Sequence, residues 1–168
     1  MTTFDLRTLR IRSGDQARER VEIELEPLLL GGQTYEPRPN PAPAELAVTR
    51  ASSGSILELA FDVLLEGPCF RCLTDAELPV SLGLREYEAT KPESDEERTE
   101  YLEDDRLDLS AWARDAIALA LPDKILCRPD CAGLCQVCGK DLNAEPHEHV
   151  EERTDPRWEK LSQLQRES

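Results

Sequence analysis

The chain is poor in aromatic residues and contains no long apolar run. Aromatic residues make up 5% of its 168 residues, and hydrophobic residues of all kinds make up 39%. No stretch of 18 apolar residues occurs, so the sequence predicts no membrane-spanning helix. The first residues also lack a charged segment followed by an apolar one, so we expect no signal peptide. These absences predict a cytoplasmic protein, in a compartment where disulfides are rare.

Basic residues are few compared with acidic residues. The chain has 20 Lys and Arg against 35 Asp and Glu, which gives a formal net charge of −15. Nonspecific binding to a phosphate backbone depends on Lys and Arg, so strong unaided binding to free nucleic acid is disfavoured. A basic protein partner suits this charge better. Residues 1–20 differ from the rest, since they hold five Arg against three acidic residues.

The sequence predicts an antiparallel β unit over residues 1–90. Apolar and polar residues alternate there with the period of a half-buried strand. Residues 31–43 contain two Gly and four Pro and predict a loop. The strands are predicted at residues 4–28, around a polar turn at 13–16, and then at 45–51, 56–66 and 77–88.

Residues 91–106 are expected to form an acidic linker. Composition alone favours a solvated segment, and the alternative is an acidic arm that docks on a basic protein or mimics nucleic acid. The third predicted region, residues 107–168, contains one central helix, a cysteine-rich segment and a short tail helix at 155–164. The sequence thus predicts an α+β fold with three regions.

The central helix is predicted over residues 108–121. Asp108 or Ser110 can cap its beginning, and Pro122 ends it. Trp112 is expected to anchor the helix in the core rather than to stack on a nucleic-acid base. The buried stripe is predicted to comprise Leu109, Trp112, Ala116, Leu119 and Ala120.

Six cysteines and two histidines lie in two short windows. The spacing C-x2-C is followed by C-x3-C-x3-C-x2-C and then by His-Glu-His. A C-x2-C turn places two sulfurs about 2.3 Å from a shared Zn²⁺, and four such ligands complete a structural site. The sequence therefore predicts one or two zinc ions per chain. The candidate ligands are Cys69, Cys72, Cys127, Cys131, Cys135, Cys138, His147 and His149.

Spacing alone does not decide which ligands share an ion. The preferred pairing joins Cys69 and Cys72 to Cys127 and Cys131 across the acidic linker. The second ion then takes Cys135, Cys138, His147 and His149. The main alternative is one local site of Cys127, Cys131, Cys135 and Cys138, which leaves Cys69 and Cys72 as a free pair.

Two catalytic interpretations are disfavoured. A redox C-x2-C commonly opens a helix that lowers a thiol pKa, whereas Cys69 and Cys72 lie between two predicted strands. A hydrolytic zinc needs an open coordination position and a general base. Glu148 is the candidate base, but His-Glu-His is not the helical H-E-x-x-H arrangement. The sequence therefore favours a protein that is not an enzyme.

Several segments together resemble the YceD family of large ribosomal RNA subunit accumulation proteins. They are Cys69-Phe70-Arg71-Cys72-Leu73, the helix end at 118–122, the segment from Cys127 to Asn143, and Asp155-Pro156-Arg157-Trp158. Many family members carry a C-x-C pair after the Leu-Asn step, and His147-Glu148-His149 stands near that place here. The resemblance covers nearly the whole chain.

The resemblance implies a non-enzymatic ribosome-biogenesis factor. Its implied partner is a large-subunit ribosomal precursor or a basic ribosomal protein, with local RNA contact by the Arg-rich end and Arg71 as a hypothesis. The second hypothesis is a zinc-ribbon nucleic-acid-binding protein acting in transcription, against which the net charge argues. The third is a thiol-redox or metal-delivery protein.

Overall fold

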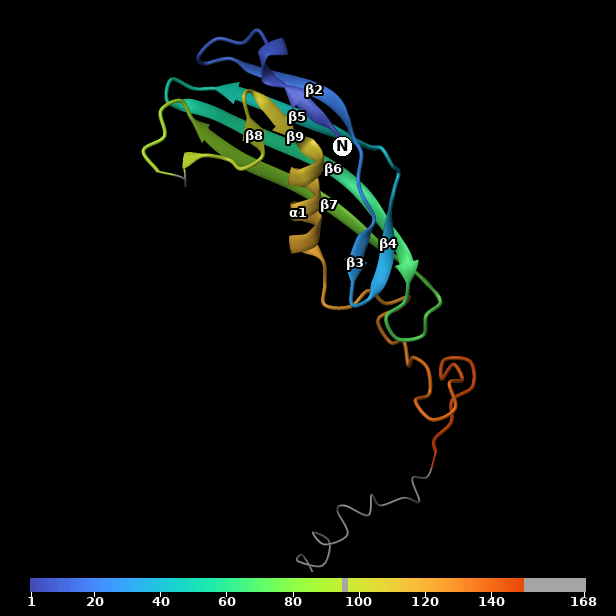
Figure 1. The fold of residues 1–168 in the computed structure, drawn as a ribbon. Coiled ribbons are helices and arrows are strands. Elements are labelled where there is room, and N and C mark those ends of the chain that lie inside the picture. Colours follow the sequence, from blue (N-terminus) through green and yellow to red (C-terminus); the bar gives the residue numbers. More distant parts are fainter. Residues whose placement is uncertain (95–96, 150–168) are drawn as a thin grey trace, which may run out of the picture. The chain divides into compact units, whose positions relative to one another are not determined.

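The computed structural model describes residues 1–94 and 97–149, and these fall into two compact units. The first unit spans Met1–Cys131 and the second begins at Ala132. Figure 1 shows that strands and one helix make up the first unit. The predicted α+β class is thereby confirmed as mostly antiparallel sheet with one α-helix among the described residues. The predicted tail helix at 155–164 lies outside the described residues.

The elements follow one another in the order given in Figure 1. They are β1 (Thr3–Asp5), the 3₁₀ helix η1 (Leu6–Thr8), β2 (Gln16–Ile23), β3 (Leu28–Leu30), β4 (Gln33–Arg38), β5 (Ala42–Arg50), β6 (Gly54–Pro68), β7 (Asp75–Ala89), β8 (Leu102–Glu103), β9 (Arg106–Asp108) and α1 (Leu109–Ala120).

Strand β6 is the centre of the larger sheet. It pairs with β7 over its whole length on one side, and with β5 and then β4 on the other. Strands β2 and β3 add to β5 and β4 respectively. Every second residue of β6 is an apolar side chain that is buried, which fixes the register of the sheet. These buried residues are Leu57, Leu59, Phe61, Val63 and Leu65.

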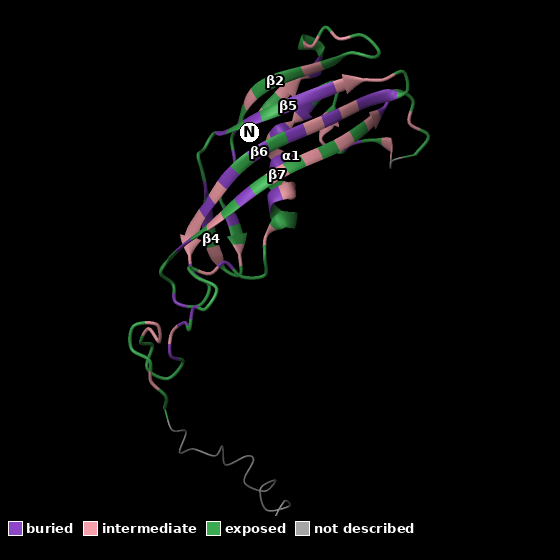
Figure 2. Ribbon diagram, turned by 180° about the vertical axis from the view of Figure 1, so that it is seen from behind, coloured by how far each residue is buried: buried purple, intermediate pink, exposed green. Residues whose placement is uncertain are grey.

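Helix α1 covers the buried face of this sheet, as the two opposite views in Figures 1 and 2 show. Its N-cap is Asp108, whose carboxylate accepts a hydrogen bond from the Ala111 amide at 3.0 Å. Trp112 is 3% exposed and its ring stacks on Tyr101, with 6.0 Å between centroids. The predicted helix and its tryptophan anchor are therefore confirmed.

The buried stripe of α1 is rotated from the predicted one. Leu109, Trp112, Ala113 and Ile117 are buried, whereas Leu119 is 90% exposed. The prediction was wrong at the end of the helix because the sheet does not extend under its last turn, where residues 118–120 are all exposed.

Two predictions about loops also need correction. Residues 33–38, predicted as loop, form β4, because Tyr35 and Pro37 alternate into the core on a strand that β6 pairs. The segment before the polar turn at 13–16 does not pair with the strand after it. Instead, β1 pairs with β9 and β9 with β8, which makes a separate three-stranded sheet.

The compact units have a different boundary from the predicted regions. The sequence analysis separated residues 1–90 from 107–168 by a linker at 91–106. In the structure, the end of that linker forms β8 and the start of β9, and α1 belongs to the first unit. Leu107 explains the difference, since it is fully buried and pairs with Phe4 of β1.

Candidate metal centres

The turn between β6 and β7 holds the first C-x2-C pair. The Cys69 amide donates to the Thr74 carbonyl at 2.7 Å, and the Leu73 amide donates to the Cys69 carbonyl at 3.0 Å. The Cys69 sulfur accepts from the Arg71 amide at 3.5 Å. Leu73 has a positive φ of 63°, which lets the chain reverse directly after Cys72. These bonds aim both sulfurs to one side of the turn.

The second C-x2-C pair repeats this turn with different residues. The Cys135 amide donates to the Lys140 carbonyl at 2.8 Å, and the Gly139 amide donates to the Cys135 carbonyl at 2.8 Å. Gly139 has a positive φ of 73° and follows Cys138 as Leu73 follows Cys72. The chain therefore builds the same metal-binding knuckle twice, from the spacing of its cysteines and the residue after them.

The first cluster joins its knuckle to two cysteines that follow α1. The sulfurs of Cys69, Cys72, Cys127 and Cys131 all lie within 4.8 Å of one another. The Cys69 and Cys131 sulfurs are 3.8 Å apart, and those of Cys72 and Cys127 are 3.6 Å apart. A tetrahedral zinc with ligands at 2.3 Å has sulfurs about 3.8 Å apart. This donor set fits one zinc ion.

Neighbouring contacts hold the two halves of the first cluster together. The Phe70 amide donates to the Ile125 carbonyl at 2.8 Å, and the Arg71 guanidinium donates to the Cys131 carbonyl at 2.6 Å. Ile125 is 2% exposed, so it anchors the segment after α1 in the core. Arg71 thus has a structural role beside the cluster.

Tyr35 and Gly67 set the position of the first knuckle. The Tyr35 hydroxyl donates to the Pro68 carbonyl at 2.9 Å, and its ring lies where a side chain on residue 67 would stand. A Cβ at Gly67 would come within 2.5 Å of that ring. Burial and the charge of Cys69 raise the pKa of Tyr35. Neither residue was identified from the sequence, although Gly67-Pro68 directly before Cys69 marked a special turn.

Backbone amides favour the thiolate form of the first cysteine in each knuckle. Burial opposes ionisation of Cys69, but the amides of Cys72, Cys127 and Arg71 outweigh it and lower its pKa to about 6. Desolvation and the neighbouring Cys72 raise the pKa of Cys127 to about 12. Four thiolates this close repel one another, so a cation is needed to hold them all ionised.

The second cluster draws all four ligands from one short stretch of chain. The donor atoms of Cys135, Cys138, His147 and His149 lie within 4.8 Å of one another. The Cys138 sulfur is 3.1 Å from the His147 Nε2. Amides of Cys138 and Val137 lower the pKa of Cys135 to about 6. Two sulfurs and two imidazoles are a donor set that suits tetrahedral zinc.

A hydrogen bond outside this ligand set orients His147. Its Nδ1–H donates to the Glu145 carbonyl at 2.7 Å, which leaves Nε2 free to face the sulfur. The same bond, followed by the Cys135 thiolate, raises the pKa of His147. Glu145 is held in turn by Lys140, with 2.7 Å between Nζ and Oε2. The loop therefore presents one defined tautomer to the metal position.

Short polar contacts shape the rest of the second loop. Leu134 and Asp141 form an isolated antiparallel bridge, and the Leu142 amide donates to the Gly133 carbonyl at 2.9 Å. The Asn143 side chain accepts from the Ala132 amide at 2.8 Å. Residues 132–149 include no helix and no strand longer than this bridge. This loop has little apolar core of its own.

The structure gathers the eight candidate ligands into the two sets of the preferred pairing. The four cysteines of the alternative local site are divided between the two clusters. Metal binding at these clusters remains a prediction, and their geometry is that of two sites capable of holding an ion. The residues that sequence reasoning missed are the supporting ones, since Tyr35, Thr74, Ile125 and Asn143 carry no spacing signal.

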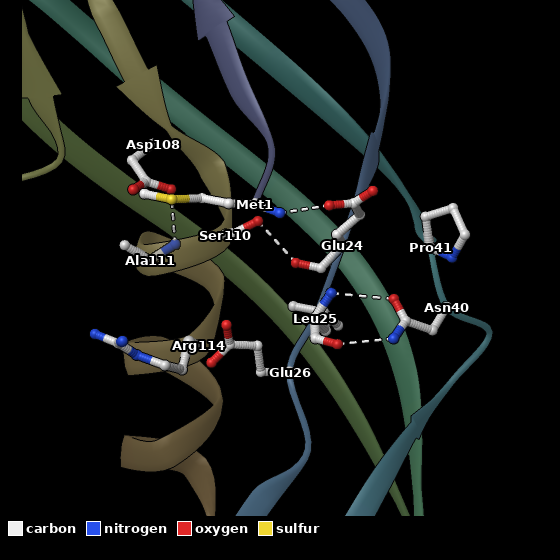
Figure 3. A pocket seen from close by; sticks show the side chains of 10 residues that line it. All are labelled: Met1, Glu24, Leu25, Glu26, Asn40, Pro41, Asp108, Ser110, Ala111 and Arg114. Atoms are coloured by element: carbon white, nitrogen blue, oxygen red, sulfur yellow. Dashed lines mark hydrogen bonds and ion pairs between the residues drawn. The ribbon is translucent and has the colours of Figure 1, made fainter.

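A cavity of about 460 Å³ lies apart from both clusters, beside the beginning of α1 (Figure 3). Its polar groups bond mainly to one another. The Met1 ammonium contacts Glu24, and the Ser110 hydroxyl donates to the Glu24 carbonyl at 2.7 Å. The Asn40 amide bonds both backbone groups of Leu25. These contacts tie strand ends to α1 and leave no convergent set of unsatisfied groups for a ligand.

No helix within residues 1–94 and 97–149 is long and apolar enough to cross a membrane. A search of solved structures found no match. Among curated proteins, an uncharacterised protein of Mycobacterium tuberculosis is 37% identical over 125 residues, which cover 71% of this chain and 60% of that protein. An uncharacterised protein of Mycobacterium leprae is 38% identical over 101 residues, covering 57% of this chain and 46% of that protein. The matched part of this chain therefore spans 60% or less of these relatives' length.

A family model gives the most direct classification. The model for the large ribosomal RNA subunit accumulation protein YceD matches residues 57–165, which is well over half of the chain. The matched stretch contains both knuckles and all eight candidate ligands. The resemblance noted from the cysteine segments is thus confirmed, and the chain belongs to the YceD family.

Proposed function

We propose that this protein is a non-enzymatic ribosome-biogenesis factor that supports the accumulation of large-subunit ribosomal RNA. The observation that carries the proposal is the match to the family of that name, over a stretch that includes every candidate metal ligand. Each cluster holds one zinc ion in this proposal, so a folded chain carries two. The ions act as structural staples.

The donor sets argue for a structural and against a catalytic role. Each cluster supplies four Cys or His ligands, and a four-coordinate zinc with four protein ligands has no open position for substrate or water. The amides that lower the pKa values of Cys69 and Cys135 favour thiolates, which is also what a zinc ligand needs. Redox or hydrolytic chemistry is therefore not part of the proposal.

The charge of the chain suggests the kind of partner. A net charge of −15 repels RNA in general and attracts a basic protein. We propose a large-subunit precursor as the target, with a basic ribosomal protein as the direct contact. Arg residues of the N-terminal segment supply any local RNA contact. Arg71 is left out of that contact set, because it already donates to the Cys131 carbonyl.

Co-sedimentation tests this proposal directly. Purified protein is mixed with large-subunit precursors, ribosomal subunits or free RNA at low and moderate salt, and its metal content is measured in parallel. We expect two zinc ions per chain and sedimentation with the large-subunit precursors. Failure to sediment with them at either salt concentration would exclude direct action on the particle.

A cellular test separates the role in RNA accumulation from binding alone. In cells without the gene, the ratio of large-subunit to small-subunit ribosomal RNA is expected to fall. The wild-type chain should restore it, and Cys69→Ser should not, while Ser53→Ala on the exposed β5–β6 turn serves as a control. Strong binding to free duplex DNA in a gel-shift series would instead favour a transcriptional zinc ribbon.

A further inference from the structure

Strand β7 leaves one of its edges open. It pairs with β6 from Asp75 to Ala89 and with no other strand of the described residues. Figure 2 shows it running along the border of the sheet. Among residues 1–94 and 97–149, no backbone hydrogen bond outside the β6 ladder involves β7. An open edge presents unpaired N–H and C=O groups to another strand.

Pro79 indicates which residues of β7 face that edge. It lies opposite Leu64 in the interior of the β6–β7 ladder. Because proline has no N–H, its nitrogen belongs on the side away from β6, where the ladder needs no donor. Backbone groups alternate along a strand, so the odd-numbered residues direct theirs to the free edge. All of them are exposed: Asp75, Glu77, Pro79, Ser81, Gly83, Arg85 and Tyr87.

The even-numbered residues leave apolar surface at the same edge. They lie on the face of the sheet that carries the core, in register with the buried residues of β6. Val80 is 8% exposed, whereas three leucines beside it are only half-buried. A further strand on this edge would cover them. The three are Leu78, Leu82 and Leu84.

The opposite face of β7 carries an uncompensated carboxylate. Glu36, Glu66 and Glu77 lie in register across β4, β6 and β7. Arg38 pairs with Glu66, with 3.5 Å between Nε and Oε2, but no described cation pairs with Glu77. Like charges directly opposite one another destabilise a sheet. A cation arriving on the free edge would relieve this.

We propose that β7 pairs antiparallel with β7 of a second copy of this chain, centred on Ser81. In this register, Arg85 of each copy lies opposite the partner's Glu77 on the outer face. On the inner face, Val80 lies opposite the partner's Leu82 and Leu78 opposite the partner's Leu84. The dimer thereby joins two sheets into one, and its basis is independent of the proposed function.

Molar mass in solution tests the proposal. The full chain with its metal is measured by light scattering over a concentration series at moderate salt, which screens the repulsion between two chains of charge −15. We expect a mass twice that of the 18.9 kDa chain at the upper concentrations. A single-chain mass at every concentration and salt overturns the proposal.

Backbone variants test the edge. Ser81→Pro removes the outward N–H at the centre of the pairing and leaves the β6 ladder intact, while Ser81→Ala keeps that N–H. We expect Ser81→Pro to abolish the dimer and Ser81→Ala to retain it. Zinc content and circular dichroism report whether each variant folds. A dimer that survives Ser81→Pro in a folded chain overturns the proposal.

Charge reversal tests the register. Arg85→Glu sets two carboxylates opposite each other at both ends of the pairing, and we expect dimerisation to weaken about tenfold. Glu77→Arg combined with Arg85→Glu restores the opposite charges and should restore the dimer. Arg18→Glu is the matched control, since Arg18 also pairs with a glutamate, Glu45, but on β2. Loss in Arg85→Glu without rescue in the double variant excludes this register.

Discussion

The two metal centres share one knuckle and differ in what completes them. In the first, the other two cysteines follow 55 and 62 residues later along the chain, after β7 and α1. In the second, the two histidines follow within the same loop. Three of the four ligands in the first centre are buried, whereas Cys138 and His149 are exposed in the second. One turn thus serves as a clasp for a large sheet and as the organising centre of a small loop.

This comparison predicts its largest effect for the clasp. Cys69→Ser should reduce zinc from two ions to one per chain and lower the unfolding free energy of the first unit by at least about 3 kcal/mol. The reason is that the variant leaves three buried or crowded thiols without their ion. Chemical denaturation combined with elemental analysis measures both quantities. Unchanged zinc stoichiometry in Cys69→Ser would rule out the long-range clasp.

The next largest effect is expected in the second loop. Cys135→Ser should also remove one zinc ion, and residues 132–149 should lose protection from hydrogen exchange because they have little core. The first unit should change in stability by less than about 0.5 kcal/mol. Gln136→Ser, at the adjacent exposed position, is the control. Equal destabilisation of the first unit by Cys69→Ser and Cys135→Ser would mean that the two centres fold as one.

A chelator should distinguish the centres by rate. The exposed ligands of the second centre give a chelator access, so its zinc should leave at least about tenfold faster than that of the buried first centre. Zinc release and thiol labelling followed together should show two phases. Cys135 and Cys138 should be labelled in the first phase, as mass spectrometry can establish. A single phase would remove the proposed difference in accessibility.

The smallest effects concern the residue after each C-x2-C pair. Gly139→Ala should cost about 1 kcal/mol in zinc binding by the second centre, because φ is positive there while the space around a Cβ is open. Leu73→Gly should stabilise the first centre by about 0.5 kcal/mol, since it relieves the left-handed backbone of an exposed leucine. Competition titrations with a zinc indicator measure both. Effects of the same sign would show that the two knuckles are not equivalent.

The sequence predicted the ligands and the main strands because both leave a periodic signal. The spacing of Cys69, Cys72 and the later cysteines identified the donor set, and alternation located β6, β7 and α1. Proline content misled the prediction at β4, since Pro37 occupies a strand position that needs no donor. The supporting residues Tyr35 and Ile125 were missed because their roles depend on which distant segments meet. Spacing within a motif is local, whereas the second half of the clasp is set by the fold.

The pairing of β1 with β9 has a consequence for the order of folding. The Thr2 amide bonds the Ser110 hydroxyl, 108 residues away along the chain, and β1 pairs with no other strand among the described residues. During synthesis, the first strand therefore waits until α1 has emerged, and the clasp waits longer, until Cys131 has emerged. The hairpin of β6 and β7 can form before either. The molecule is thus assembled from its middle outward, with its beginning secured among the last steps.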